Sequence, residues 1–410
     1  MKKEKKITRL ISEGVNDLFY VWKEEIKNVF KDSGVVIFFF LVPLAYPVIY
    51  SLIYNPETVH EVKVVAVDQC NSAYSREFIR RVNATSDVRI VDICPSMDEA
   101  KKMLDRKEAF GIISFPSDFS KNLHSGRQAT VSLYSDMSLL LYYKAILLSA
   151  TEVSLDMGKE ISARSNQQST DKLSEIQINP VPYESVALFN PSNGFASFLL
   201  PAVLILVIQQ TLVLGIGMLG GTARERNRFH HLIPENRHFH GTLRAVLGKS
   251  LAYLIIYVIV CLWTLVIVPK IFAFPDISER GTLLIFLLPF LFACIFFAMT
   301  LSGFMRTRES PMMIFVFLSV ILLFLSGISW PKEAFPLYWR IISDIFPSTP
   351  GVKGYVLLKS CGATLNEVAC EYSLLWLQTG FYFITACLVY RRQIIFVEKK
   401  QESLSYKNHR

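Results

Sequence analysis

The chain has 410 residues, of which 51% are hydrophobic, and it carries a formal net charge of +8. Such an apolar composition excludes an intrinsically disordered protein. Six long stretches contain no charged residue, and each is near the roughly 20 residues that cross a hydrocarbon core. They are Gly34–Tyr54, Ser197–Gly220, Leu251–Val268, Leu283–Phe304, Pro311–Ser329 and Tyr372–Tyr390. The sequence therefore predicts a polytopic α-helical membrane protein with six transmembrane helices.

Residues 1–33, which precede the first stretch, have apolar side chains at three- and four-residue spacing. Lys and Glu fill the other face, and Trp22 lies on the apolar one. This pattern predicts an amphipathic helix in the plane of the inner leaflet. A soluble bundle helix is the alternative interpretation. The apolar run begins only at Gly34 and lacks a small-residue cleavage site, so we expect a retained anchor and not a signal peptide.

The first two predicted spans carry candidate residues of a translocation path. Pro43 and Pro47 lie in the first span, where each proline removes a helical hydrogen bond and bends the helix. The bend either allows the helix to pack against its neighbours or acts as a hinge beside a translocation path. The sequence leaves both interpretations open. Gln209 and Gln210 are among the strongest polar groups of the spans.

The distribution of charge predicts the orientation in the membrane. Segments 1–33, 221–250, 305–310 and 391–410 together hold 22 Lys and Arg against 11 Asp and Glu. By the positive-inside rule these segments face the cytoplasm, and so do both termini. The topology accounts for the basic charge, so we expect no nucleic-acid partner.

Residues 55–196 form the one large segment between spans, and they are long enough to bury a core. Apolar runs predict strands at Val62–Asp68, Asp87–Val91, Phe110–Phe115 and Ala129–Tyr134, with helices between them. The order β-α-β-α-β-α-β predicts an extracytoplasmic α/β domain inserted between the first and second spans.

Four cysteines lie in predicted outside segments. Cys70 and Cys94 each follow a predicted strand, and Cys361 and Cys370 lie in the loop 330–371. An oxidising compartment permits a disulfide in each pair. No His lies at ligand spacing to these cysteines, so we expect no metal site.

Motifs for catalysis are missing from the sequence. Gly248-Lys249-Ser250 is similar to the end of a P-loop, but Leu243 occupies the position of its first glycine. No arrangement of nucleophile and base is recognisable either. The predicted spans also lack the ionisable groups that proton- or sodium-driven carriers use. These patterns favour a transporter that another subunit drives, or a receptor, and no enzyme.

Six segments in chain order resemble the permease subunits of ABC-2 type exporters. They lie in 23–43, 65–76, 111–123, 190–201, 224–249 and 326–350. No single segment is specific, whereas all six in order with this topology are quite specific. The resemblance covers nearly the whole chain.

The resemblance implies half of an exporter. A second permease chain, identical or paralogous, would complete the path. A separate cytoplasmic ATPase, which binds ATP and Mg, would contact the loop 221–250. The residues carried over as ATPase contacts are Arg224, Glu225, Arg226, Leu232, Ile233 and Pro234. The family's Gly-Thr pair is replaced around residues 227–230, which implies a particular ATPase partner. Segment 330–371 is similar to the family's re-entrant helices that cap the path.

The size of the segment 55–196 resembles drug- or lipid-type members of the family. This implies efflux of an amphipathic or hydrophobic compound across a bacterial inner membrane, with a periplasmic adaptor protein docked on the domain. A domain that only dimerises the exporter is the simpler interpretation. A membrane receptor or scaffold with an extracytoplasmic sensor domain stays open as a second class of function.

Overall fold

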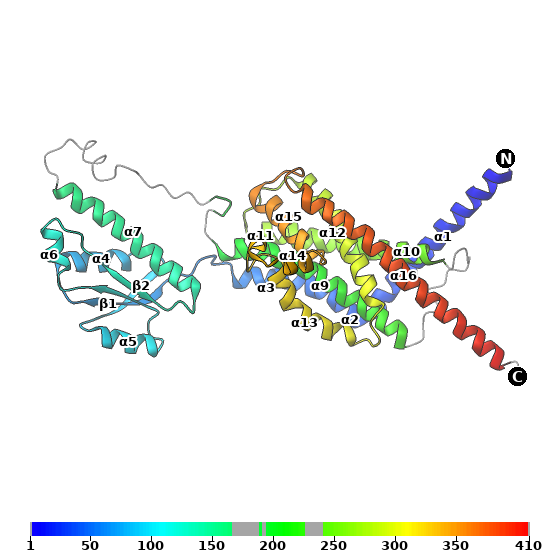
Figure 1. Ribbon diagram of the computed structural model, residues 1–410, viewed down its shortest axis with the longest axis horizontal. Coiled ribbons are helices and arrows are strands. Elements are labelled where there is room, and N and C mark those ends of the chain that lie inside the picture. The colour runs from blue at the N-terminus through cyan, green and yellow to red at the C-terminus, as the bar shows by residue number, and fades with distance from the viewer. Residues whose placement is uncertain (1, 166–187, 191–193, 226–240, 409–410) are drawn as a thin grey trace. The chain divides into compact units, whose positions relative to one another are not determined.

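The computed structural model describes residues 2–165, 188–190, 194–225 and 241–408. The chain divides into two compact units (Figure 1). The helical unit comprises Met1–Asn55 and Phe195–Arg410, and the α/β unit comprises Pro56–Gly194.

The α/β unit contains one sheet of four strands in the order β2-β1-β3-β4. The strands are β1 (Val62–Asp68), β2 (Val88–Cys94), β3 (Gly111–Phe115) and β4 (Ser132–Ser135). Strand β1 pairs in parallel with β2 and β3, and β4 is antiparallel to β3. The central strand β1 is an almost continuous apolar run because both of its faces are buried.

Helices cover both faces of this sheet. They are α4 (Ala73–Asn83), α5 (Met97–Asp105), α6 (Phe119–His124) and α7 (Leu140–Ser165). Helices α4 and α7 pack on one face, while α5 packs on the other. Ser72 and Ser75 form a capping box at the start of α4, and Ser75 donates a 2.6 Å hydrogen bond to Asp68 at the end of β1. The alternation of strands and helices follows the order expected from the sequence.

The helical unit holds the remaining elements. They are α1 (Lys2–Lys31), α2 (Ser33–Val36), the π-helical η1 (Ile37–Leu41), α3 (Val42–Ile53), α9 (Phe195–Glu225), α10 (Thr242–Cys261), the π-helical η4 (Leu262–Ile267), α11 (Val268–Ile271), α12 (Arg280–Ser302), α13 (Ser310–Leu325), η5 (Lys332–Ala334), α14 (Leu337–Ser343), α15 (Ser348–Cys361) and α16 (Ala369–Asn408). Within the described residues, five segments are long and apolar enough to cross a membrane. These are Ser33–Ile53, Phe195–Glu225, Thr242–Ile271, Arg280–Ser302 and Ala369–Ile395.

The predicted fifth span, residues 311–329, is shorter in the structure than the sequence suggested. Helix α13 has 16 residues and ends at Leu325, which at a rise of about 1.5 Å per residue gives roughly 24 Å. The predicted span extended to Ser329 because residues 326–329 are also uncharged. Composition alone cannot show that the helix ends at Leu325. A sixth full-length span is therefore not confirmed.

Helix α9 lies at the centre of the helical unit and packs against α12, α13 and α15. Close approach at α9 depends on residues without a side chain. A Cβ atom on Gly215 would lie 1.9 Å from the ring of Phe39, and one on Gly221 would lie 2.3 Å from the carbonyl oxygen of Thr307. Small residues let helices of a membrane protein approach closely, and α9 follows this rule.

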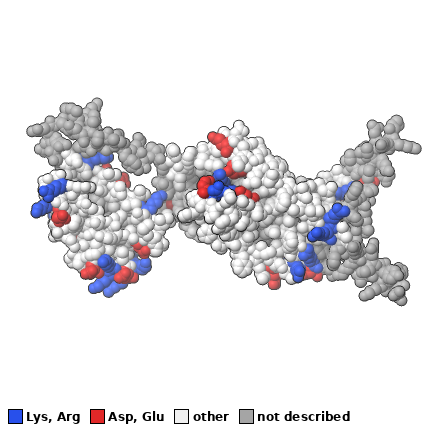
Figure 2. Space-filling model, in the orientation of Figure 1, with Lys and Arg blue, Asp and Glu red and all other residues white. Residues whose placement is uncertain are grey.

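The surface of the helical unit matches its apolar sequence. Large apolar side chains are exposed along α3, α12, α13 and α16, including Leu52, Ile285, Phe317 and Ile384. Figure 2 shows broad areas of this unit without charge, while Lys and Arg gather near the end where α1 and α16 leave the bundle. Such a surface suits contact with lipid chains.

Candidate coupling region and lysine cavity

The region around residues 226–240 was predicted to contact an ATPase. Arg226, Leu232, Ile233 and Pro234 lie outside the described residues. The predicted loop 221–250 is also too wide, since α9 continues to Glu225 and α10 begins at Thr242. Glu225 is exposed at the end of α9.

Arg224 ties the end of α9 to the end of α12. Its guanidinium donates to the carbonyl oxygen of Met305 at 2.9 Å and to that of Gly303. These carbonyls follow the last turn of α12, where a helix leaves acceptors without partners and attracts cations. Arg224 is thus engaged within the chain, a role that the sequence resemblance did not indicate.

On the other side of residues 226–240, α10 is joined to α1 by buried ion pairs. The Lys249 ammonium lies 2.8 Å from Glu25, and both side chains are buried. The Tyr253 hydroxyl donates to the same carboxylate, and Lys249 lies 5.8 Å from the centre of the Tyr390 ring. A second ion pair joins Arg244 to Asp17.

These contacts add to the interpretation of residues 1–33. Four side chains of α1 at four-residue spacing are buried, and α1 packs against α10; they are Asp17, Val21, Glu25 and Val29. Phe19 and Phe30 on α1 are exposed, as apolar side chains of a helix that lies in the leaflet would be to lipid. The placement of α1 in the leaflet stays a prediction. The spacing of Glu25 with Val21 and Val29 was the one sequence signal for this packing.

Asp32 makes a further connection at the start of the first span. Its carboxylate accepts from the backbone N–H of Gly34 at 3.0 Å and thereby caps α2. It also lies 2.6 Å from Arg308, in the connection between α12 and α13. Ion pairs therefore link the N-terminal helices to both α10 and the α12–α13 connection.

The two prolines of the first span are buried against the π-helical segment η4. Pro47 has no N–H for the carbonyl of Pro43, and the Thr264 hydroxyl donates to that carbonyl at 3.1 Å instead. The Trp263 indole donates to the carbonyl of Leu44 at 3.0 Å. These bonds support the packing interpretation of the bend, and the hinge stays a prediction.

Gln209 lies in the core of the bundle, away from any surface. It is completely buried, and its Nε2 has no hydrogen-bond partner among the described residues. Its Oε1 accepts a weak bond from the Cys294 thiol at 3.8 Å. Gln210 is partly exposed. In this conformation Gln209 does not line an open path.

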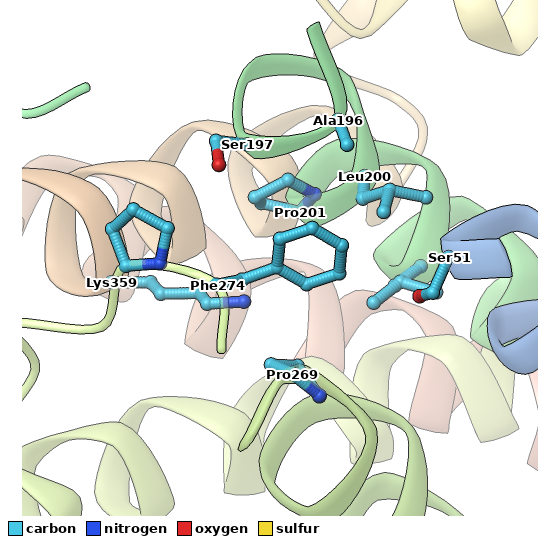
Figure 3. A pocket seen from close by; sticks show the side chains of 10 residues that line it. Ser51, Ala196, Ser197, Leu200, Pro201, Pro269, Phe274 and Lys359 are labelled. Carbon is cyan, nitrogen blue, oxygen red and sulfur yellow. The ribbon is translucent and has the colours of Figure 1, made fainter. Parts of the chain in front are cut away.

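A small cavity forms where α3, α9, the α11–α12 connection and α15 meet (Figure 3). Its free space is about 10 Å³, enough for one water-sized group, within about 270 Å³ of empty volume that includes open solvent. The lining residues are Ser51, Ala196, Ser197, Leu200, Pro201, Leu204, Pro269, Phe274, Pro275 and Lys359. Lys359 is the one charged residue of this lining.

Lys359 is 2% exposed, and in the described part of the chain no carboxylate forms an ion pair with it. Burial lowers the pKa of its ammonium group to about 8, and Asp276 acts in the opposite direction. No signal in the sequence pointed to this residue, because Lys359 lies in a segment, 330–371, that was expected to be outside the membrane.

Helix α15 holds Lys359 in place by close packing. A Cβ on Gly351 would lie 2.6 Å from Phe290, and one on Gly354 would lie 2.2 Å from Phe286, so both glycines lie directly against α12. The carbonyl of Lys359 accepts from Ile277 N–H at 3.0 Å. Most residues of α15 are buried, which fixes the direction of this lysine.

The cysteine pairs expected from the sequence are not joined in the structure, where all four residues are free. The Cys70 thiol donates to Asp68 at 3.2 Å and packs with the core on the α4 side of the sheet. Cys94 contacts Met103 on the α5 side. Because the sheet separates these two thiols, the Cys70–Cys94 pairing was wrong for this fold. Cys361 ends α15, and Cys370 lies in the first turn of α16.

A family model described as ABC-2 family transporter protein matches residues 34–388. No curated protein is a significant match to the chain. The family match includes the whole α/β unit and reaches from the first to the last of the five described segments that are long and apolar enough to span a membrane.

Proposed function

Because the chain belongs to the ABC-2 transporter family, a family of membrane transport components, we propose that it is the permease subunit of an ATP-driven exporter. The observation that carries this proposal is the family match from residue 34 to residue 388, over a bundle in which five described helices are long and apolar enough to span a membrane. Helix α13 would act as the sixth span, and both termini would lie in the cytoplasm of a bacterial cell.

A separate ATPase, which binds ATP and Mg, would drive the permease through residues 221–250. The exposed Glu225 and the residues 226–234 are the proposed contacts. Arg224 links one end of this region to α12, and the pairs Asp17–Arg244 and Glu25–Lys249 link the other end to α1. A displacement that the ATPase imposes on the ends of α9 and α10 would therefore act on α12 and α1.

The cargo would be an amphipathic or hydrophobic compound, moved out through a path completed by a second permease chain. The apolar core of the helical unit supports this class of cargo. The α/β unit would lie outside the inner membrane, where it would dock a periplasmic adaptor protein. Helices α14 and α15 would form the re-entrant pair that caps the path.

The test is co-purification of the chain with the ABC ATPase encoded beside it, in detergent. We compare the wild type with the double variant Glu225→Arg, Pro234→Ala. Glu279→Arg is the matched control, since Glu279 is an exposed acid in the segment predicted to be outside. The proposal predicts a stable complex for the wild type and the control, and a weakened one for the double variant. Failure of the wild type to retain any ATPase would favour the receptor or scaffold function.

A further inference from the structure

The two buried lysines of the described chain differ in how their charge is compensated. Lys249 has the carboxylate of Glu25 at 2.8 Å and an aromatic ring at 5.8 Å. Lys359 is equally buried, but within the described residues it forms no ion pair: the ring of Tyr355 lies 5.8 Å from its ammonium, and Asp276 acts on it only at longer range. Burying a charge without a close counter-charge costs several kcal/mol. A buried ionisable residue that lines a cavity is therefore a candidate functional residue.

The lysine also lines a cavity with an amphipathic wall. Figure 3 shows its side chain reaching the same small space as Phe274, Pro201 and Leu200. Most of the lining residues are apolar, among them Leu200, Leu204 and Phe274, and Lys359 supplies the single charge. This combination is complementary to a molecule with one anionic group and an apolar chain.

We propose that this cavity binds the anionic group of a single-chain amphiphile, with one of its oxygens on the Lys359 ammonium and its apolar chain along Leu200 and Phe274. The inference rests on the proposed export function in that it names the class of cargo. All four lining elements meet where the sequence predicts the outer side of the membrane. The site would therefore hold cargo near the face of the membrane at which it is released.

The dimensions of the cavity favour one source of this ligand over another. Its free space of about 10 Å³ admits one water-sized group beside the ammonium, such as a carboxylate or phosphate oxygen. The rest of the ligand must lie in the part of the roughly 270 Å³ that is open to the surroundings. A fatty-acid-like anion meets this requirement better than a two-chain phospholipid, whose headgroup is flanked by glycerol.

The protonation of Lys359, which follows from the same burial, gives the proposal a second testable property. With the pKa lowered to about 8 by burial, the ammonium is charged at pH 7 and is largely neutral at pH 9.5. The other titratable groups near it are Asp276, which favours the charged form, and Tyr355 on the same helix. Anion binding should therefore weaken as the pH rises through about 8.

The experiment measures equilibrium binding of radiolabelled oleate to the purified full chain in dodecyl maltoside. Oleyl alcohol has the same chain without the charge, acetate has the charge without the chain, and phosphatidylglycerol is the two-chain competitor. Lys359→Gln removes the charge, Lys359→Arg retains it, and Lys270→Gln removes an exposed lysine next to the lining residue Pro269.

The proposal predicts oleate binding that Lys359→Gln weakens by about ten- to a hundredfold, as expected for loss of a hydrogen bond to a charged group. Lys359→Arg and Lys270→Gln should bind within about threefold of the wild type, and oleyl alcohol should be insensitive to all three changes. Equal oleate binding by the wild type and Lys359→Gln would overturn the proposal. Displacement of labelled oleate by phosphatidylglycerol at lower concentrations than unlabelled oleate requires would overturn the single-chain class.

A matched measurement guards against misfolding of the variants. Each protein must elute as a single species from gel filtration, and Lys359→Arg must bind oleate if the cavity is intact. No ATPase is present in the assay. A failure to couple to an ATPase would therefore leave this result unchanged, and a failure to bind oleate would leave the permease proposal standing.

Discussion

Lys359→Met should stabilise the protein, although it removes a side chain from a packed helix. The gap between the ordinary pKa of 10.5 and the value of about 8 in the folded chain, at about 1.36 kcal/mol for each pH unit, corresponds to about 3 kcal/mol. This is the order of the cost of keeping the ammonium charged in the cavity. Methionine is of similar length and carries no charge, so the variant avoids this cost.

The pH dependence of this effect has a definite sign. Below about pH 8 the lysine is protonated in both states, and the folded state bears the full cost. Between pH 8 and 10.5 only the unfolded state binds the proton, so the wild type becomes more stable relative to the variant as the pH rises. The advantage of Lys359→Met should therefore be largest at pH 7 and should have nearly vanished at pH 10.5.

The assay is thermal unfolding in dodecyl maltoside, followed by intrinsic fluorescence at pH 7, 8.5 and 10. Comparing the two proteins at each pH cancels the titration of groups that they share. Lys270→Met is the control, because an exposed lysine should change stability by less than about 0.5 kcal/mol at any pH. A Lys359→Met protein that is less stable than the wild type at pH 7, or whose advantage is the same at pH 10, would refute the reasoning.

Two further predictions concern packing of the bundle. Gly354→Ala should lower the free energy of unfolding by about 1–3 kcal/mol, because its Cβ would lie 2.2 Å from the ring of Phe286. Gly380→Ala, whose Cβ meets nothing within 4 Å, should be neutral or slightly stabilising in the same unfolding assay. Glu25→Gln should cost about 3–5 kcal/mol because it leaves Lys249 buried without its counter-charge. A Glu25→Gln protein as stable as the wild type would show that this pair does not hold α1 on α10.

Much of the fold was predictable because its signals are local. The alternation of short apolar runs and capped helices predicted the strands and helices of the α/β unit, and Ser72 caps α4 as a serine at such a position should. Charge-free windows located five helices that can cross a membrane. The same criterion overestimated α13, because it counts apolar residues without detecting where the helix ends.

The features that sequence could not supply depend on contacts between distant segments. Periodicity showed that α1 has two faces, but it could not show that Glu25 packs against Lys249, 224 positions later. The hydrogen bond from the Thr264 hydroxyl to the carbonyl of Pro43 could not be predicted either, because it forms only when η4 packs beside α3. Lys359 lies in a segment of mixed polarity, and its burial follows only from the packing of α15 against α9 and α12.

The central claim is that a separate ATPase drives this permease through residues 221–250. The most direct test is ATP hydrolysis by the complex of chain and ATPase, reconstituted in lipid, for the wild type and for the double variant Glu225→Arg, Pro234→Ala. The account predicts that the wild-type chain alters the hydrolysis rate of the ATPase, and that the double variant loses this effect while its helical unit unfolds at the wild-type temperature. An unchanged hydrolysis rate in the presence of the wild-type chain would contradict the claim.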